Sequence, residues 1–129
     1  MSDNRAPVGV FDSGIGGLTV GREPERQTPA ERTITFGDRA RGADGPRNAD
    51  EVRSVTLECA AWLLAQDVKL LVLACNTATS QALPLVREMA SVPVLGVVRP
   101  GALAAAASTR AGHVGVIATA GTVTSGAYP

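Results

Sequence analysis

The chemistry that this sequence could perform is concentrated where an apolar run gives way to three polar residues. The run is Leu70–Ala74, and Cys75, Asn76 and Thr77 follow it directly. Such a run before a helix-like segment is typical of a strand buried in a parallel α/β sheet, and ligands bind beyond the carboxyl ends of these strands. The positive end of the following helix would favour the thiolate, which is the reactive form of a cysteine. The alternative is a buried structural cysteine, because free cysteines are among the most buried residues.

A glycine-rich turn near the N-terminus supplies a second polar cluster. Asp12 and Ser13 open this turn, residues 12–17, directly after the apolar segment Pro7–Phe11. The turn lacks the G-x-G-x-x-G spacing of a dinucleotide-binding loop, and no Gly-Lys-Ser/Thr follows it. A carboxylate at this position would repel a phosphate and suits a ligand that carries an ammonium group. The alternative is an ordinary strand-to-helix turn with Asp12 near the helix N-terminus.

The pattern of apolar segments predicts the elements that position these clusters. Strands and helices are expected to alternate in the order β-α-β-α-β-α-β-α-β, which predicts an α/β fold with a doubly wound parallel sheet flanked by helices, over one domain, 1–129. The tips of four strands would then converge on one crevice, with Thr119 and Thr122 at the last tip. The predicted strands are Pro7–Phe11, Thr33–Phe36, Leu70–Ala74, Val92–Val98 and His113–Ala118. His113 would lie at the opposite end of its strand and is interpreted as an ordinary surface histidine.

Two of the predicted helices carry clear local signals. Pro24 falls inside the first helix, which is expected to stop or kink near Glu23, because an interior proline costs about 3 kcal/mol. Asn48 is expected to cap the second helix, with Glu51 three residues later in a capping-box pattern. The apolar positions of that helix recur at helical spacing and include Cys59, which is therefore predicted to belong to the core.

The composition limits the class of protein. With 45% hydrophobic residues but only 3% aromatics, the core is expected to consist of Val, Leu, Ile and Ala. Twelve basic residues balance twelve acidic ones, so no nucleic-acid or membrane partner is predicted. No apolar run approaches the ~20 residues of a membrane span, and no signal peptide is recognisable, so a cytoplasmic location is expected. Cys59 and Cys75 lack metal-ligand spacing, and no metal is expected.

These polar clusters occur together with further short motifs in an order that resembles the glutamate racemase family, within the cofactor-independent aspartate/glutamate racemase superfamily. The resemblance extends along nearly the whole chain, and the coincidence of several motifs makes it specific. The matching stretches are Val10–Val20, Phe36–Asp38, Gly45–Arg47, Cys75–Ala78, Gly96–Val98, Pro100–Gly101, Gly121–Thr122 and Ser125–Tyr128.

The resemblance implies a racemisation of glutamate, without a cofactor, that supplies D-glutamate for peptidoglycan. In this reaction one cysteine thiolate removes the α-proton and a second cysteine returns a proton to the opposite face. The α-proton is very weakly acidic, so the base must be held close and shielded from water. By resemblance, Cys75 is the first catalytic cysteine, and the substrate-binding residues are Asp12 and Ser13 near the amino group, Asp44, Gly45, Asn76 and Thr77, and Thr122 near the carboxylate.

Several departures from the family pattern accompany the resemblance. The family has a second, similar lobe with a Gly-Cys-Thr-His motif, whereas this sequence reaches Pro129 without one, so a single N-terminal lobe is expected. Asp44 replaces a tyrosine, and Arg99 replaces a glutamate close to the expected crevice. With Cys59 in the core, no second catalytic cysteine is expected, and the chain alone is predicted to be inactive.

Two other interpretations stay open at this point. The chain could be a non-catalytic module that binds glutamate or another protein and retains half of a ligand crevice. It could also be a related aspartate or hydantoin racemase, although the Asp-Ser-Gly-x-Gly-Gly turn favours glutamate. A homodimer could in principle place two copies of Cys75 around one substrate.

Overall fold

The computed structural model describes residues 5–14, 17–38, 40, 41 and 48–128. In chain order, the elements of this described part are β1 (Val8–Asp12), α1 (Gly17–Gln27), β2 (Thr33–Gly37), α2 (Ala49–Leu64), β3 (Leu70–Leu73), α3 (Asn76–Met89), β4 (Val94–Gly96), α4 (Val98–Ser108) and α5 (Ala120–Thr124).

The four described strands form one parallel sheet in the order β2-β1-β3-β4. Val10 in β1 lies between Thr35 of β2 and Val72 of β3, which fixes the register of the three strands. The predicted α/β class with a parallel sheet flanked by helices is therefore confirmed. The strand order reverses between β1 and β3, and in doubly wound sheets ligands bind outside the carboxyl ends of the strands at this point.

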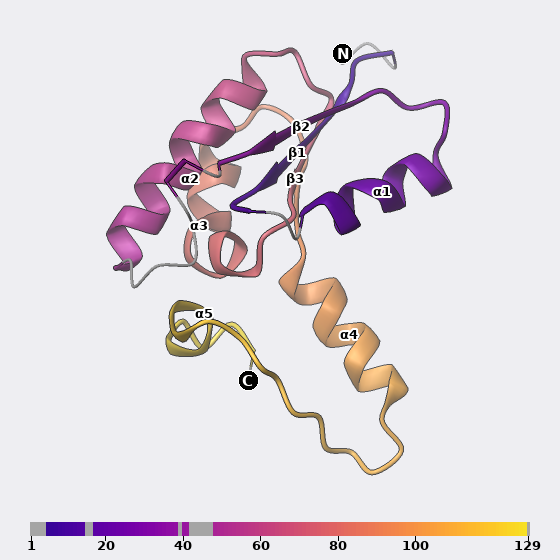
Figure 1. The fold of residues 1–129 in the computed structure, drawn as a ribbon, viewed down its shortest axis with the longest axis vertical. Coiled ribbons are helices and arrows are strands. Elements are labelled where there is room, and N and C mark those ends of the chain that lie inside the picture. The colour runs from indigo at the N-terminus through magenta and orange to yellow at the C-terminus, as the bar shows by residue number, and fades with distance from the viewer. Residues whose placement is uncertain (1–4, 15–16, 39, 42–47, 129) are drawn as a thin grey trace.

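Helices cover the two faces of the sheet unequally (Figure 1). On one face, α2 and α3 pack over a buried cluster that includes Phe11, Leu63, Leu71 and Leu73, and Cys59 belongs to it as predicted. The aromatic Phe11 thus joins the aliphatic residues expected in the core. On the other face, α1 contributes Val20 to a smaller cluster. Complete burial of one large apolar side chain contributes roughly 1.5–3 kcal/mol, so the first cluster is the main source of stability.

Local signals set the bounds of two helices. The Asn48 side chain accepts a hydrogen bond from the Glu51 backbone N–H at 2.9 Å, which confirms the predicted N-cap of α2. Of the two outcomes expected near Glu23, a stop or a kink, the stop does not occur, because α1 continues through Pro24 to Gln27. Proline removes a single N–H from the helix, and Thr28 closes the last turn with two hydrogen bonds of 2.7 Å from its backbone N–H and its hydroxyl to the Pro24 carbonyl.

The C-terminal third of the chain departs most from the prediction. The expected strand His113–Ala118 is not formed, and the expected strand 92–98 is reduced to β4, because α4 already begins at Val98. A strand requires a hydrogen-bonded neighbour, and no described strand pairs with residues 113–118. His113 is exposed, as expected of a surface residue.

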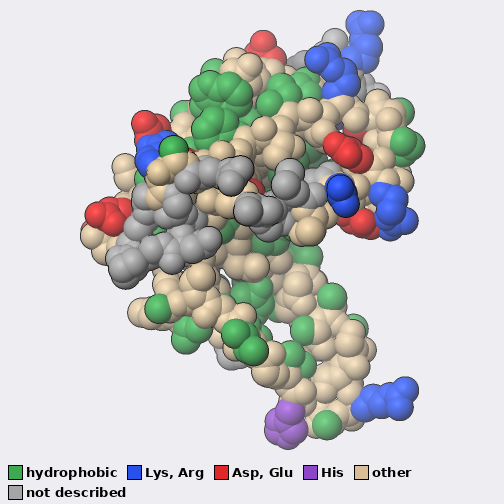
Figure 2. Space-filling view, in the orientation of Figure 1, with side chains coloured by type: hydrophobic (Ala, Val, Ile, Leu, Met, Phe, Trp, Pro, Cys, Tyr) green, Lys and Arg blue, Asp and Glu red, His purple; other side chains and the backbone are tan. Residues whose placement is uncertain are grey.

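We call residues 98–128 the C-terminal arm, which comprises α4, the connecting loop and α5. The arm projects from the carboxyl end of the sheet and returns, so that α5 lies beside α3 (Figure 1). Apolar side chains are exposed along it, including Leu103, Val114, Val116 and Ile117. Figure 2 shows hydrophobic side chains distributed over the arm on the side that faces the viewer.

Candidate active site

Cys75 lies where the sequence predicts it, at the junction between β3 and α3. It adopts an extended backbone conformation and acts as the N-cap of α3, and its Sγ accepts a hydrogen bond from the Ala78 N–H at 3.4 Å. The Ser13 Oγ lies 3.0 Å from the same sulfur, so the tips of β1 and β3 meet at this thiol. Cys75 is 9% exposed, which shields the sulfur from most solvent but leaves it open to the crevice.

Asp12 closes β1 directly beside this pair. Its carboxylate is buried, and Oδ2 accepts a hydrogen bond from the Gly14 N–H at 3.0 Å. This bond shapes the turn that brings Ser13 to the thiol. Asp12 therefore shapes the turn between strand and helix, as the structural alternative predicts. It also lines the crevice, as a ligand-binding carboxylate must.

Three threonine hydroxyls form a compact cluster next to the thiol. The Thr77 Oγ1 lies 2.8 Å from that of Thr119 and 3.2 Å from that of Thr122, and the latter two are 3.1 Å apart. We call this cluster the hydroxyl triangle. Thr119 also caps α5 by accepting the Thr122 N–H, so the triangle joins α5 to the first turn of α3.

Asn76 and Tyr128 form a second link between α3 and the end of the arm. The Tyr128 hydroxyl donates a hydrogen bond to Oδ1 of Asn76 at 2.8 Å. No local pattern predicts this contact, because the two residues are 52 positions apart. In the sequence, Tyr128 belongs to the matching stretch Ser125–Tyr128, but no role in the site is predicted for it.

These groups surround one crevice of about 500 Å³, within the size range of small-molecule sites. The walls come from the tips of β1 and β3, from the start of α3 and from the arm. Six of the sequence-predicted site residues line it: Asp12, Ser13, Cys75, Asn76, Thr77 and Thr122. The two other predicted site residues, Asp44 and Gly45, lie outside the described residues.

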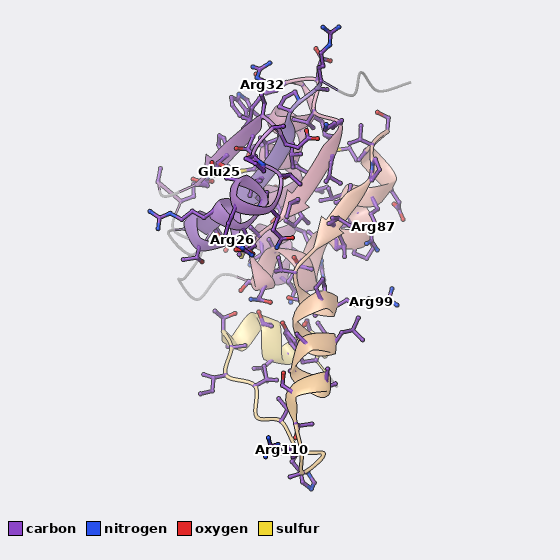
Figure 3. All side chains as sticks on the ribbon, turned by 90° about the vertical axis from the view of Figure 1, so that its right-hand side faces the viewer. Glu25, Arg26, Arg32, Arg87, Arg99 and Arg110 are labelled. Carbon is purple, nitrogen blue, oxygen red and sulfur yellow. The ribbon has the colours of Figure 1, made fainter. Side chains whose placement is uncertain are left out.

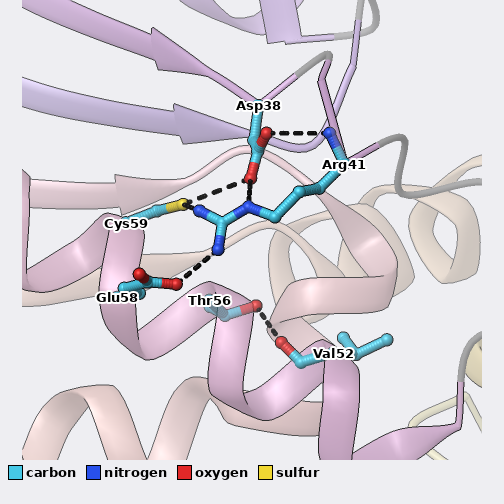
Figure 4. A network of polar contacts seen from close by, with 6 residues as sticks. All are labelled: Asp38, Arg41, Val52, Thr56, Glu58 and Cys59. Carbon is cyan, nitrogen blue, oxygen red and sulfur yellow. Dashed lines mark hydrogen bonds and ion pairs between the residues drawn. The ribbon is translucent and has the colours of Figure 1, made fainter.

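A polar network lies at the tip of β2 (Figure 4), and its residues Asp38 and Arg41 line a second pocket together with Cys75. The buried Asp38 carboxylate accepts hydrogen bonds from the Arg41 backbone N–H at 3.2 Å and from its Nε at 2.6 Å. Arg41 also pairs with Glu58, so its charge is already compensated within the protein. Burial would raise the pKa of Asp38, but the hydrogen bonds and charge of Arg41 outweigh it and lower that pKa.

Cys59 completes this network and is a poor candidate for a base. Its Sγ lies 3.8 Å from Oδ2 of Asp38 and 3.7 Å from Nη2 of Arg41. Burial, together with the negative charge of Asp38, raises the pKa of Cys59 to about 11. The thiol therefore stays protonated near neutral pH, in agreement with its predicted place in the core.

Arg99 does not lie at the crevice, which corrects the position expected for it. It belongs to the first turn of α4 and lines a separate groove of about 490 Å³ with Arg87, and both side chains extend on the same side of the molecule (Figure 3). The prediction failed because it extended β4 to Val98, whereas the strand ends at Gly96. The charge of Arg99 therefore faces this groove rather than the thiol.

The described residues offer neither a metal-binding cluster nor a helix that could span a membrane. They contain no group of three or more His, Cys, Asp or Glu side chains arranged to hold a metal ion. Among them, none of the helices combines the length and the hydropathy needed to cross a membrane.

The fold and the crevice place the chain in a known class of proteins. The sequence model of the family described as Asp/Glu/Hydantoin racemase matches residues 17–129, and the chain belongs to this family. It is 52% identical over 126 residues to a glutamate racemase of Streptococcus gordonii, covering 98% of this chain and 47% of the relative. A glutamate racemase of Oceanobacillus iheyensis is also 52% identical, over 121 residues that cover 94% and 44% of the two chains.

Solved structures show the same relationship. The crystal structure of a glutamate racemase from Bacillus anthracis matches with a TM-score of 0.92 at 44% identity, over 98% of this chain and 47% of that chain. The glutamate racemase of Thermus thermophilus, in complex with β-chloro-D-alanine, matches with a TM-score of 0.88 at 52% identity, over 98% and 48%. This chain therefore spans about half the length of the racemases that it matches.

Proposed function

We propose that this chain is the half of a glutamate racemase that carries one catalytic thiol, with Cys75 acting on one face of the substrate α-carbon. The observation that supports this most is the arrangement around the Cys75 sulfur. The Ala78 N–H and the Ser13 hydroxyl both lie within hydrogen-bonding distance of Sγ, at 3.4 Å and 3.0 Å. Two donors on one sulfur stabilise the thiolate that proton abstraction requires.

The reaction is a proton transfer in two halves. The Cys75 thiolate takes the α-proton, the C–H electron pair stays on the α-carbon and is delocalised into the adjacent carboxylate, and a second acid returns a proton to the opposite face. Among the described residues of the crevice there is no other thiol and no imidazole. The second acid therefore has to come from outside this described part, as the family resemblance implies.

The crevice offers complementary groups for an amino acid. The Asp12 carboxylate suits the substrate ammonium, whereas the hydroxyl triangle and the Asn76 amide suit a carboxylate. The solved glutamate racemase of Francisella tularensis, 38% identical, is in complex with D-glutamate, which supports glutamate as the substrate. Asp44 and Gly45 remain predicted substrate contacts. A role in peptidoglycan synthesis and a cytoplasmic location follow from this substrate as further predictions.

Incubation in D₂O with each enantiomer of glutamate tests the proposal, with α-deuteration measured by NMR and inversion by circular dichroism. We expect slow deuteration of one enantiomer by the chain alone and no measurable inversion, because the described part of the crevice offers one thiol base, on one face of the substrate. Cys75→Ala should abolish deuteration, whereas the matched variant Cys59→Ala should retain it. Deuteration that persists in Cys75→Ala, or a chain that neither binds nor exchanges glutamate, would contradict the proposal.

A second candidate function is a non-catalytic glutamate-binding module. The presence of a single thiol among the described residues of the crevice favours it. Glutamate binding without deuteration of either enantiomer would identify this case. Sustained inversion that depends on Cys75 would exclude it and would show that a second base reaches the crevice.

A further inference from the structure

The orientation of the Asn76 side-chain amide determines whether this residue presents a hydrogen-bond donor or an acceptor to a ligand. Asn76 is the first residue of α3, directly after Cys75, and its exposed side chain lines the crevice. An asparagine amide presents an acceptor on one side and two donors on the other, and rotation about its last side-chain torsion exchanges them at little cost. A carboxylate in the crevice would be attracted by the NH₂ group and repelled by the carbonyl oxygen.

Tyr128 supplies the contact that fixes this orientation. Its hydroxyl lies 2.8 Å from Oδ1 of Asn76 and donates to it. Within the described residues, no hydrogen bond involves the amide nitrogen of Asn76. The carbonyl side of the amide is therefore occupied by the protein, and the NH₂ side is left to donate to a ligand.

The fold holds Tyr128 in place from both sides. Gly126 has a φ of +67°, a conformation that glycine adopts without strain, and it turns the chain back toward α3 after α5. Ser125 anchors this turn, because its Oγ donates to the Thr122 carbonyl at 2.6 Å and accepts the Ala127 N–H at 3.2 Å. Across the tyrosine, a Cβ added to Gly101 of α4 would lie 3.6 Å from the Tyr128 hydroxyl. The hydroxyl thus lies between the start of α3 and the first turn of α4, in a contact that stays exposed to solvent.

We propose that Tyr128 is a positioning residue of this crevice: its hydroxyl holds the Asn76 amide so that the NH₂ group points toward a carboxylate of the bound amino acid. The inference rests on the proposed function, since it concerns glutamate in the same crevice. Without the hydroxyl, the amide samples both orientations, and one of them faces the carboxylate with an oxygen. Because a fixed donor loses less entropy on binding than a rotating one, Tyr128 increases affinity without touching the ligand.

A double-mutant cycle on the full chain tests this inference, with D-glutamate affinity measured by NMR titration of ¹⁵N-labelled protein. Tyr128→Phe should weaken binding by about twofold, since the amide then presents its NH₂ group to the ligand only about half of the time. In the background of Asn76→Ala the same substitution should have almost no further effect, because a residue that acts through Asn76 couples to it. Ser108→Ala is the matched control, because it removes an exposed hydroxyl of the arm that bonds only within α4, to the Ala104 carbonyl at 2.8 Å, and it should bind like the wild type.

The side-chain amide of Asn76 gives a second readout that does not require a ligand. In the wild type its nitrogen and proton shifts should report a single orientation, whereas Tyr128→Phe should move or broaden them toward an average of two orientations without lowering the melting temperature appreciably. Equal losses of affinity from Tyr128→Phe with and without Asn76, or a loss that only follows thermal destabilisation, would overturn the positioning role. Wild-type protein that does not bind D-glutamate would overturn the proposed function, and this inference with it.

Discussion

At the scale of single residues, the two cysteines differ in environment although both are buried. The Cys75 sulfur faces the crevice, accepts the Ala78 N–H and lies 3.0 Å from the Ser13 hydroxyl, whereas burial and Asp38 raise the pKa of Cys59 to about 11. We therefore expect iodoacetamide to label Cys75 at least about tenfold faster than Cys59 at pH 7.5, because the thiolate is the reacting form. Peptide mapping by mass spectrometry measures both rates in one sample. Faster labelling of Cys59 would remove the basis for Cys75 as the base.

Asp38 gives a second prediction at this scale, for stability against pH. Its folded-state pKa is lowered by the hydrogen bonds and charge of Arg41, in spite of burial, so its stabilising contribution is complete above the unfolded-state pKa and is lost as the pH falls through the folded value. Asp38→Asn should therefore lower the free energy of unfolding by about 1–3 kcal/mol at pH 7 and by progressively less below pH 4. Urea denaturation at several pH values measures the difference, and a gap that stays constant with pH would exclude this linkage.

At the scale of elements, the close approach of β4 to α3 depends on the absence of one side chain. A Cβ on Gly96 would lie 2.4 Å from Cγ2 of Thr79 and 2.9 Å from Cδ2 of Leu83. Gly96→Ala should therefore push strand and helix apart and destabilise the fold by about 1–3 kcal/mol, the usual cost of overpacking. Gly115→Ala is the matched control, since nothing lies within 4 Å of its added Cβ. Equal unfolding midpoints in urea for the two variants would contradict this account.

The elements also show how far local sequence determines this structure. The strands β1, β2 and β3 and the cap of α2 were predictable, because an apolar run or a capping pattern fixes each of them within a few residues. The expected strand at 113–118 has the same local pattern, but a strand also needs a neighbour to accept its hydrogen bonds. The crevice was predictable only in part: the tips of β1 and β3 meet in it, whereas Asp38 at the tip of β2 lines a separate pocket, and Thr119 and Thr122 come from the start of α5 and not from a strand tip. The contact between Asn76 and Tyr128 was not predictable, because it depends on how the arm folds back onto α3.

At the scale of the whole molecule, the arm exposes more apolar surface than a small monomer usually leaves open. Ile117 is fully exposed, Leu103 and Val123 are more than half exposed, and Leu95 on β4 adds to them. We expect the isolated chain to self-associate at high concentration and to melt below about 65 °C. Light scattering coupled to size exclusion, together with calorimetry, measures both. Ile117→Asp should reduce association without lowering the melting temperature, and a monodisperse wild-type monomer that melts well above 65 °C would refute this expectation.

The loop between α4 and α5 also determines what limited proteolysis would do to this protein. Residues 110–117 are exposed, and Arg110 lies at the far end of the arm (Figure 3), where a trypsin-like protease can reach the peptide bond that follows it. After a cut there, the severed tail would be retained only by non-covalent contacts, chief among them the hydroxyl triangle and the bond from Tyr128 to Asn76. Its departure would leave the sheet and Cys75 intact and remove one wall of the crevice. A single cleavage would thus divide the lining of the crevice, with Thr119, Thr122 and Tyr128 on the released piece and Asp12, Cys75 and Asn76 on the piece that remains.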